Sequence, residues 1–334
     1  MVALSNNDAW PLIVVAGPTA SGKSSLAIAL AELLQGEPAF AGGEIVSCDS
    51  VAVYKLMDIG SAKPNSAERA RVPHHCLDLF WPNEPCTAGD YSRAARSAIA
   101  GIRERGNIPI VAGGTGLYLR ALLEGLAPAP PRDEALRERL REREATRGTG
   151  YLHRLLRRLD ARAAAAIHAN DTPKLIRSIE VTHAARTPQS AQWAAGRDRL
   201  KGYRILKLGL APEREKLYER IDTRCEQMFA RGLVEETAML REKFGGDCAA
   251  LGALGYAQSL AVLRGEISRE QALAATRQGH RNYAKRQGTW FRRESDMHWL
   301  AGFGDDASVR DEALSMARLV CTLVLKPVSA STGD

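Results

Sequence analysis

Four short apolar runs, rich in Val and Ile, alternate along the chain with stretches of helical periodicity. The runs lie at residues 12–16, 45–48, 108–112 and 205–208, each bounded by Gly, Pro, Asp or charge, which is typical of buried β-strands. Apolar positions recur at helical spacing in residues 25–34 and 91–105. Strands that alternate with helices predict an α/β fold with a parallel sheet flanked by helices.

The pattern changes after the third strand. Pro128, Pro130 and Pro131 form a stiff break, and helical sequence follows to about residue 168. We therefore predict a core whose first part covers residues 10–127, an inserted helical subdomain at 128–202, and a mostly helical completion of the core at 203–325. The small and polar residues at the C-terminal end predict a frayed tail at 326–334.

The overall composition is that of an ordinary globular protein. Hydrophobic residues make up 45% and charged residues 25% of 334 residues, and the six cysteines form no C-x-x-C pair, which argues against disorder, a zinc ribbon or a redox couple. The first residues lack the pattern of a signal peptide, and no uncharged apolar run approaches ~20 residues. We expect a cytoplasmic protein that does not span a membrane, and no obligate protein partner is evident.

Positive charge is concentrated near the C-terminal end. The net charge is +7, and residues 269–293 hold seven Lys or Arg side chains and one acid, with Tyr283, Trp290 and Phe291 among them. This mixture either pairs phosphates and stacks on bases or packs on a neighbouring helix, and the sequence leaves both open. Residues 132–162 are also rich in Arg, but acids are mixed in at helical spacing, which favours a solvated helix.

Residues 17–24 match the phosphate-binding pattern G-x-x-x-x-G-K-[ST]: Gly17, Pro18, Thr19, Ala20, Ser21, Gly22, Lys23 and Ser24. The match directly follows a predicted strand and precedes a predicted helix, the context that the motif requires. Its backbone N–H groups and the helix N-terminus surround a phosphate, the lysine neutralises oxygens, and the serine hydroxyl suits Mg²⁺. The motif does not identify the phosphate compound, and ATP is the default expectation.

Two further strand ends carry candidate chemistry. Asp49 follows the second strand and lies near the phosphate loop if the first two strands are neighbours; it acts on substrate or metal, or it caps a turn. The third strand ends in Gly113, Gly114 and Thr115, so the carboxylate that ATPases carry there is not evident. The glycines permit close backbone approach to a ligand, and the threonine offers a hydroxyl.

Five segments resemble the tRNA dimethylallyltransferase family (tRNA isopentenyltransferases, or IPP transferases) in order and spacing, over nearly the whole chain. They are residues 17–24, 49–64, 72–75, 113–118 and 283–290, with weaker matches at 171–181 and 221–235. The resemblance implies a P-loop NTPase-like core and transfer of a dimethylallyl group from dimethylallyl diphosphate to tRNA. The acceptor is the exocyclic N6 amine of the adenine 3′ of the anticodon, tRNA position 37, and diphosphate is released without ATP.

The resemblance also implies roles for particular residues. The phosphate loop, Lys23 and Mg²⁺ stabilise the leaving diphosphate as its charge grows. Asp49 resembles the general base that takes a proton from the weakly nucleophilic amine. Thr115 resembles a hydroxyl contact near the reacting centre, and Arg224 resembles a diphosphate-binding arginine. The target base must be turned out of its loop into a pocket.

Contacts to the anticodon stem-loop are implied for four parts of the chain: the segment that begins at Asp49, the end of the third strand, the helical insertion, and the basic C-terminal stretch. The residues are Asp49, Ser50, Val51, Ala52, Thr115, Arg137, Asp171, Lys174, Arg177, Lys285 and Arg286.

Some positions depart from the family pattern. Many relatives carry Gln where Ala52 stands, Thr where Ser61 stands, and a basic residue where Ala257 stands. Since an alanine cannot hydrogen-bond a base edge, we predict that Ala52 broadens reading of the base beside the target. His74 and His75 have no third ligand at a suggestive spacing, so we assign no zinc.

Three other functions remain open. A P-loop small-molecule kinase would turn over ATP, and a nucleic-acid-binding ATPase would use Asp49 as its catalytic carboxylate. An adenylate isopentenyltransferase would prenylate a free nucleotide. The helical insertion and the basic stretch favour RNA as the acceptor.

Overall fold

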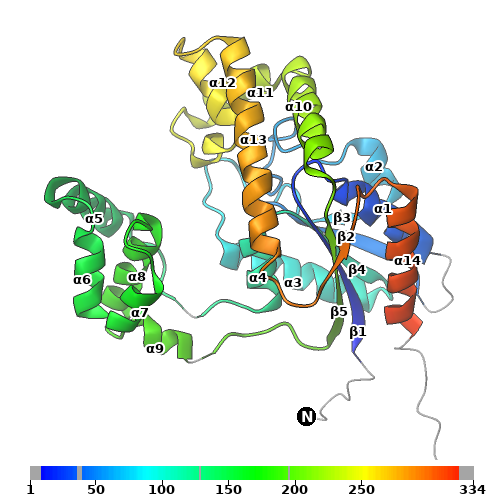
Figure 1. The fold of residues 1–334 in the computed structure, drawn as a ribbon, viewed down its shortest axis with the longest axis horizontal. Helices are drawn as coiled ribbons and strands as arrows, with labels where there is room; N and C mark the ends of the chain where they lie inside the picture. Colours follow the sequence, from blue (N-terminus) through cyan, green and yellow to red (C-terminus); the bar gives the residue numbers. More distant parts are fainter. Residues whose placement is uncertain (1–8, 36–39, 128, 195, 323–334) are drawn as a thin grey trace, which may run out of the picture. The chain divides into compact units, whose positions relative to one another are not determined.

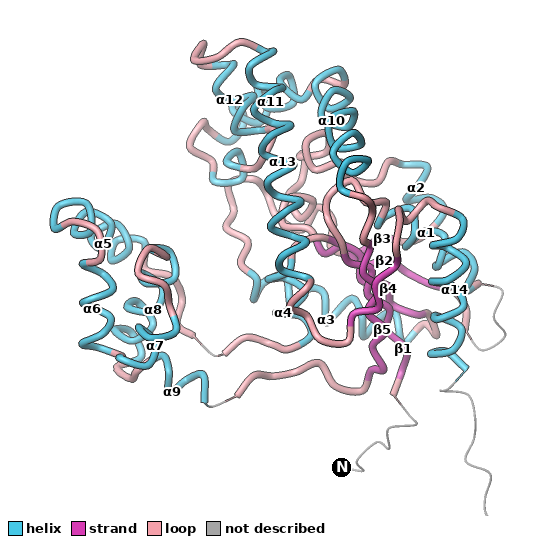
Figure 2. Tube along the Cα trace, in the orientation of Figure 1, coloured by secondary structure: helices cyan, strands magenta, loops and turns pink. Residues whose placement is uncertain are grey.

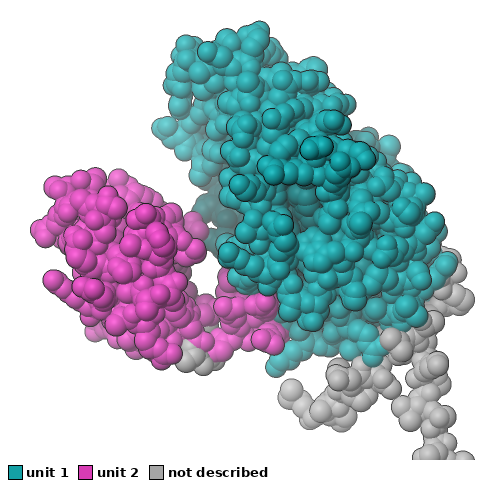
Figure 3. Space-filling view, in the orientation of Figure 1, with its two compact units in different colours: residues 1–123, 200–334 teal, residues 124–199 magenta. Residues whose placement is uncertain are grey.

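The computed structural model describes residues 9–35, 40–127, 129–194 and 196–322 (Figure 1). The chain divides into two compact units: unit 1 comprises residues 1–123 and 200–334, and unit 2 comprises residues 124–199 (Figure 3). The tail predicted at 326–334 lies outside the described residues. Within the described ranges, none of the helices combines the length and apolar composition that crossing a membrane requires.

Unit 1 is built on a six-stranded parallel sheet, which confirms the predicted α/β fold class (Figure 2). The strands are β1 (Trp10–Ala16), β2 (Gly43–Cys48), β3 (His74–His75), β4 (Ile108–Gly113), β5 (Tyr203–Leu210) and β6 (Met297–Leu300). Their order across the sheet is β3-β2-β4-β1-β5-β6. The four predicted strands are β1, β2, β4 and β5, whereas the short edge strands β3 and β6 were missed because they contain only two and four residues.

The helices of unit 1 lie partly on the two faces of this sheet and partly outside it. In unit 1 they are α1 (Lys23–Leu34), α2 (Ser66–Arg71), α3 (Ala88–Glu104), α4 (Gly116–Leu123), α10 (Arg214–Ala230), α11 (Leu233–Phe244), the 3₁₀ turn η1 (Ala249–Gly252), α12 (Tyr256–Leu263), α13 (Arg269–Phe291) and α14 (Ala307–Thr322). The helices predicted at 25–34 and 91–105 are therefore confirmed as α1 and α3.

The strand sequences explain the layers, because successive side chains of a strand point to opposite faces. Ile13 and Val15 of β1 pack with α1 and α14, whereas Leu12 and Val14 pack with α3 and α4. Both faces are apolar, and the sheet is therefore buried between two helical layers (Figure 1). Buried strands of this kind hold their carboxyl-end loops rigidly at one edge of the sheet.

A separate apolar cluster joins α11, α12 and α13 to the segment that follows β2. Met57 is fully buried there among Leu233, Leu240 and Tyr256. This cluster lies outside the sheet, so the segment after β2 is anchored by helices that come some 180 residues later in the chain.

Unit 2 is entirely helical within its described residues. Its helices are α5 (Glu134–Arg147), α6 (Tyr151–Leu159), α7 (Ala161–Ala166), α8 (Thr172–Ala185) and α9 (Gln189–Ala194). Leu140, Leu152, Leu156, Leu175 and Ile179 form its own small core.

Candidate functional site

The phosphate loop takes its shape from backbone conformations that glycine favours. Gly17 and Gly22 have φ values of 153° and 85°, and Ala20 also has a positive φ of 62°. A Cβ on Gly22 would lie 2.7 Å from the backbone N of Gly304, so glycine is required there for close packing as well. Lys23 opens α1 and donates from Nζ to the Pro18 carbonyl at 2.6 Å. The ammonium group therefore lies inside the loop.

Asp49 and the phosphate loop approach each other across an intervening strand. The sequence-based expectation depended on β1 and β2 being neighbours, and this was wrong because β4 lies between them. Gly113 and Gly114, at the end of β4, explain why the approach is still possible. A Cβ on Gly113 would lie 2.0 Å from the Cys48 carbonyl oxygen, so the glycine pair lets the two loops approach without side chains of its own between them.

The Asp49 carboxylate organises the turn that follows it. Its Oδ1 accepts hydrogen bonds from the backbone N–H groups of Val51 at 2.8 Å and Ala52 at 3.1 Å. The Thr115 hydroxyl accepts from the backbone N–H of Ser50 at 3.0 Å. The end of β2 and the loop after β4 are thus tied together beside the carboxylate.

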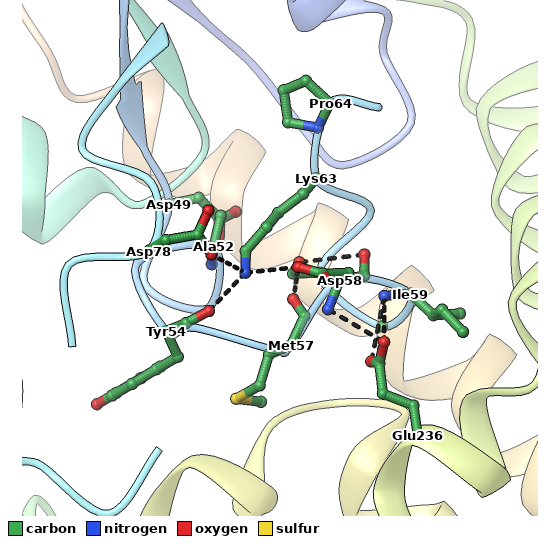
Figure 4. Close-up of polar contacts among 12 residues, drawn as sticks. Asp49, Ala52, Tyr54, Met57, Asp58, Ile59, Lys63, Pro64, Asp78 and Glu236 are labelled. Atoms are coloured by element: carbon green, nitrogen blue, oxygen red, sulfur yellow. Dashed lines mark hydrogen bonds and ion pairs between the residues drawn. The ribbon is translucent and has the colours of Figure 1, made fainter. Parts of the chain in front are cut away.

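The remainder of this segment, residues 49–64 (the Asp49 segment), is fixed by two charged side chains (Figure 4). Lys63, whose side chain is 1% exposed, donates to the Tyr54 carbonyl at 2.5 Å, to Asp58 at 2.8 Å and to Asp78 at 2.7 Å. Since an unpaired buried ammonium is strongly unfavourable, these three acceptors stabilise one conformation of the segment.

The second side chain is Glu236 of α11. Its carboxylate accepts from the backbone N–H groups of Asp58 and Ile59 and from the Tyr256 hydroxyl, while that hydroxyl accepts from the Gly60 N–H at 3.1 Å. Leu56 and Ala62 have positive φ values of 63° and 50°, conformations that persist only where the surroundings impose them. These long-range bonds impose them here.

Two cavities meet at Asp49. The phosphate-loop cavity, of about 100 Å³, is lined among others by Thr19, Lys23, Ser24, Asp49, Ala52, Arg224 and Gln287. The His280 cavity, of about 480 Å³, is lined among others by Asp49, Tyr54, Ala253, His280, Tyr283 and Arg286. Thr19, Asp49, Arg224 and Tyr283 line both. The carboxylate therefore lies between a small cationic cavity and a larger one.

The electrostatics of the small cavity suit an anion. Burial and, to a lesser extent, the nearby Arg224 lower the pKa of Lys23 to about 7, although Asp49 opposes both effects. Burial also lowers the pKa of Arg224, whose Nη1 donates to the Thr19 hydroxyl at 3.1 Å. Two cations held close together without a matching pair of carboxylates form a site that a doubly charged anion stabilises.

Helix α13 supplies contacts that the sequence reasoning did not assign. His280, Tyr283 and Gln287 line the two cavities from one side of α13. Burial lowers the pKa of His280 to about 4 and raises that of Tyr283 to about 12, so both groups are neutral near pH 7. All three lie in or beside the segment 283–290 that was matched to the family, but nothing in the pattern showed which face of the helix turns inward.

Lys285 and Arg286, which we expected to act together on tRNA, face different cavities. Arg286 lines the His280 cavity. Lys285 lines a separate, mostly apolar cavity of about 470 Å³ with Pro18, Leu217, Phe291 and Trp299. Successive residues of a helix differ in direction by about 100°, which explains the separation.

The expected RNA-binding residues of unit 2 have partners within that unit. Glu180, fully buried, forms ion pairs with Arg177 at 2.6 Å and with Arg137 at 3.3 Å. Asp171 caps the start of α8 and pairs with Lys174, which remains largely exposed. Arg137 therefore links α5 to α8, whereas the Arg177 pair lies within α8.

His74 and His75, to which no zinc was assigned, also have protein partners. His74 Nδ1 lies 2.8 Å from the Val72 carbonyl, and His75 Nε2 lies 2.6 Å from Glu44. In the part of the chain that the structure describes, no three His, Cys, Asp or Glu side chains are grouped as a metal site.

A phosphate loop on the first strand of a parallel sheet, facing a carboxylate at the same edge, defines a P-loop α/β protein with a site for an anionic substrate. The family model of the IPP transferases matches residues 52–294. The chain belongs to the IPP transferase family.

Individual relatives agree over almost the whole chain. A tRNA dimethylallyltransferase of Koribacter versatilis (strain Ellin345) is 57% identical over 307 residues, which are 92% of this chain and 98% of that protein. Another from Solibacter usitatus (strain Ellin6076) is 52% identical over 305 residues, covering 91% of this chain and 97% of the relative.

Solved structures show the same fold. The full-length tRNA isopentenylpyrophosphate transferase of Bacillus halodurans matches with a TM-score of 0.67 and 33% identity, over 94% of this chain and 97% of that one. A eukaryotic dimethylallyltransferase acting on tRNA matches with a TM-score of 0.78 and 26% identity, over 98% of this chain and 82% of that one.

Proposed function

We propose that this protein is a tRNA dimethylallyltransferase that uses dimethylallyl diphosphate as the donor and the N6 amine of the adenine 3′ of the anticodon as the acceptor. The observation that carries the proposal is the position of Asp49 at the junction of a small cationic cavity and a larger one that His280, Tyr283 and Arg286 line. In a transferase, the catalytic general base must lie near the nucleophile of the acceptor, beside the site that holds the leaving group of the donor.

The small cavity is the donor site in this proposal. The phosphate loop, Lys23 and Arg224 surround the diphosphate, and their attraction for it grows as negative charge develops on the leaving oxygen. The pKa of Lys23 is lowered mainly by burial and next by Arg224, so the charged ammonium gains from a counterion. An allylic diphosphate supplies that counterion, and its loss of the allyl group strengthens the interaction, which accelerates bond breaking.

The His280 cavity is the acceptor site. Asp49 Oδ1 holds the turn through two amides, which leaves Oδ2 to accept the proton that the amine loses as the new carbon–nitrogen bond forms. The ring of Tyr283 and the imidazole of His280 offer neutral surfaces for a base turned out of the anticodon loop. Arg286 lines the same cavity and suits an RNA phosphate.

Mg²⁺ fits the donor site through Ser24, whose hydroxyl follows Lys23 on the wall of the phosphate-loop cavity. Magnesium is commonly held by one or two protein oxygens together with substrate phosphates. When bound there, the ion neutralises the diphosphate; Ser24 is the residue that would hold it, and Lys23 retains its own contact with the bridging oxygens. We place the reaction in the cytoplasm, because tRNA is the acceptor.

The test is an incubation of the purified protein with Mg²⁺, radiolabelled dimethylallyl diphosphate and unmodified tRNA that reads codons beginning with U, followed by nucleoside analysis. Label in the adenosine 3′ of the anticodon is the expected result. In one parallel reaction free adenosine monophosphate replaces tRNA. In another, labelled ATP replaces dimethylallyl diphosphate. Label in the free nucleotide would indicate an adenylate isopentenyltransferase, and ATP turnover without prenylation would indicate a kinase or an ATPase.

A further inference from the structure

Gln287 joins the phosphate loop to the loop that carries Thr115. The side chain, 5% exposed, reaches from α13 into the gap between the two loops. Its Oε1 accepts from the backbone N–H of Thr19 at 2.8 Å, and its Nε2 donates to the Gly114 carbonyl at 2.9 Å. The two partners, Thr19 and Gly114, are 95 residues apart in the sequence.

The partners fix the orientation of the amide. A backbone N–H can only donate and a carbonyl can only accept, so the Gln287 oxygen must face Thr19 and its nitrogen must face Gly114. Both bonds are short and largely screened from water. Losing either one would leave a buried backbone group unpaired, which costs about 1–3 kcal/mol.

The bridge also occupies the backbone N–H of Thr19. With its N–H bound to Gln287, Thr19 presents its hydroxyl to Arg224 at 3.1 Å. Thr115, next to Gly114, accepts from the Ser50 N–H, one residue after the carboxylate of Asp49. The Gln287 amide is thus linked through Thr19 to Arg224, which binds the donor in our proposal. Through Gly114 and Thr115 it is linked to the turn that carries the general base, Asp49.

Glycine at position 114 is part of the same arrangement. A Cβ there would lie 2.1 Å from Gln287 Nε2 and 3.4 Å from the Gly17 carbonyl oxygen. The phosphate loop, the loop after β4 and the Gln287 amide are therefore in close contact. A small rotation of a side chain cannot change the distance between the two loops.

We propose that Gln287 is a positioning residue, which sets the distance between the phosphate loop and the Asp49–Thr115 side of the site through its two amide hydrogen bonds. This inference rests on the proposed use of the two cavities by donor and acceptor. Misplacement by about 1 Å can cost ~10²-fold in rate, so the effect falls on turnover rather than on tRNA binding.

Two variants test the contacts of Gln287. Gln287→Glu keeps the shape of the side chain, and its ionised form also places a negative charge in the cavity that Lys23 and Arg224 line. A neutral carboxyl accepts from Thr19 with one oxygen and donates to Gly114 with the other, as the amide does. An ionised carboxylate turns an oxygen with no proton toward the Gly114 carbonyl, which is repulsive. Gln287→Met keeps the volume and removes both bonds at every pH. Gln278→Glu, at an exposed position of the same helix, is the matched control.

We expect the ratio of kcat for Gln287→Glu to kcat for the unmodified protein to be about 0.1 or lower near pH 8, where the carboxylate is ionised and has no proton to donate to Gly114. For Gln287→Met the ratio stays about tenfold or more below 1 at all pH values, with KM for tRNA within about twofold of the original. Gln278→Glu shows no change.

Melting temperatures distinguish positioning from support of the fold. A purely structural role would lower the melting temperature but leave kcat of the folded variants unchanged, and that result would overturn the proposal. An increase in KM for tRNA in Gln287→Met at unchanged kcat would also overturn it. The unmodified protein in the same assay tests the proposed function separately: if it transfers no prenyl group, the function fails before Gln287 is tested.

Discussion

The phosphate loop, residues 17–24, and the Asp49 segment, residues 49–64, line the same small cavity but are held in shape differently. The phosphate loop relies mainly on its own glycines and on the contact of Lys23 with Pro18, and it makes one long-range hydrogen bond, from the Thr19 N–H to Gln287. The Asp49 segment relies on Lys63, which pairs with Asp58 and Asp78, and on Glu236 from a distant helix.

The difference matches the task of each region. A diphosphate is bound by many equivalent N–H groups and cations, so a locally determined loop is sufficient. A base must be within hydrogen-bond reach of one particular proton, and that requires support from several elements. The comparison predicts that damage to the Asp49 segment affects turnover, whereas damage to the phosphate loop affects donor binding.

Asp49→Asn should have the largest effect and sharpens the comparison. The asparagine oxygen can still accept from Val51 and Ala52, so the turn is retained and only the base is lost. Turnover should fall about 10²–10⁴-fold while the affinity for dimethylallyl diphosphate is unchanged. Single-turnover prenylation and equilibrium binding measure the two effects, with the exposed Asp247→Asn as control. Unchanged turnover would remove Asp49 as the base.

Lys23→Met should weaken donor binding about 10- to 100-fold, the loss of a charged hydrogen bond. In the unliganded protein the pKa of Lys23 is about 7, and a diphosphate favours the protonated form. Binding above pH 7 should therefore take up a proton, and affinity should fall as the pH rises. Calorimetry in buffers of different ionisation enthalpy measures the uptake, which should vanish in Lys23→Met and persist in the exposed Lys216→Met.

The same pKa predicts a stability effect. Because the pKa of Lys23 is lower in the folded state than its ordinary value of 10.5, the charged lysine destabilises the fold fully below about pH 7. The penalty disappears as the pH rises toward the ordinary value. The free energy of unfolding, relative to Lys23→Met, should increase between those limits; a constant difference would contradict the assignment.

Glu236→Gln tests the distant support of the Asp49 segment. An amide nitrogen in place of one carboxylate oxygen faces the N–H groups of Asp58 and Ile59, so at least one hydrogen bond is lost. Turnover with tRNA should fall about tenfold, with donor affinity unchanged. Glu235→Gln, next in sequence but paired with Arg269 at the surface, is the matched control. A weaker donor affinity at unchanged turnover would contradict the assignment of the Asp49 segment to turnover and of the phosphate loop to donor binding.

Ala52→Gln should have the smallest effect. Ala52 is 5% exposed and lines the phosphate-loop cavity, and its methyl group cannot hydrogen-bond a base. The unmodified protein should prenylate tRNAs that differ only beside the target adenine at rates equal within about twofold, and the glutamine should add a few-fold preference. Sharp discrimination by the unmodified protein would contradict the prediction.

Several features were predictable from the sequence because they depend on neighbouring residues. Strands β1, β2, β4 and β5 were found from apolar runs, and the phosphate loop from its spacing between a strand and a helix. Gly17 and Gly22 determine the loop conformation, and Asp49 makes its hydrogen bonds to residues two and three positions later. Contacts of such short range are encoded locally.

The tertiary structure decided the rest. It inserted β4 between β1 and β2, and the approach of Asp49 to the phosphate loop then depended on two glycines at the end of that strand. It also turned Gln287 toward the site and Lys285 away from it. Those outcomes depend on strand order and on the rotation of α13, which are fixed by packing among residues far apart in the chain, and no local pattern of side chains specifies them.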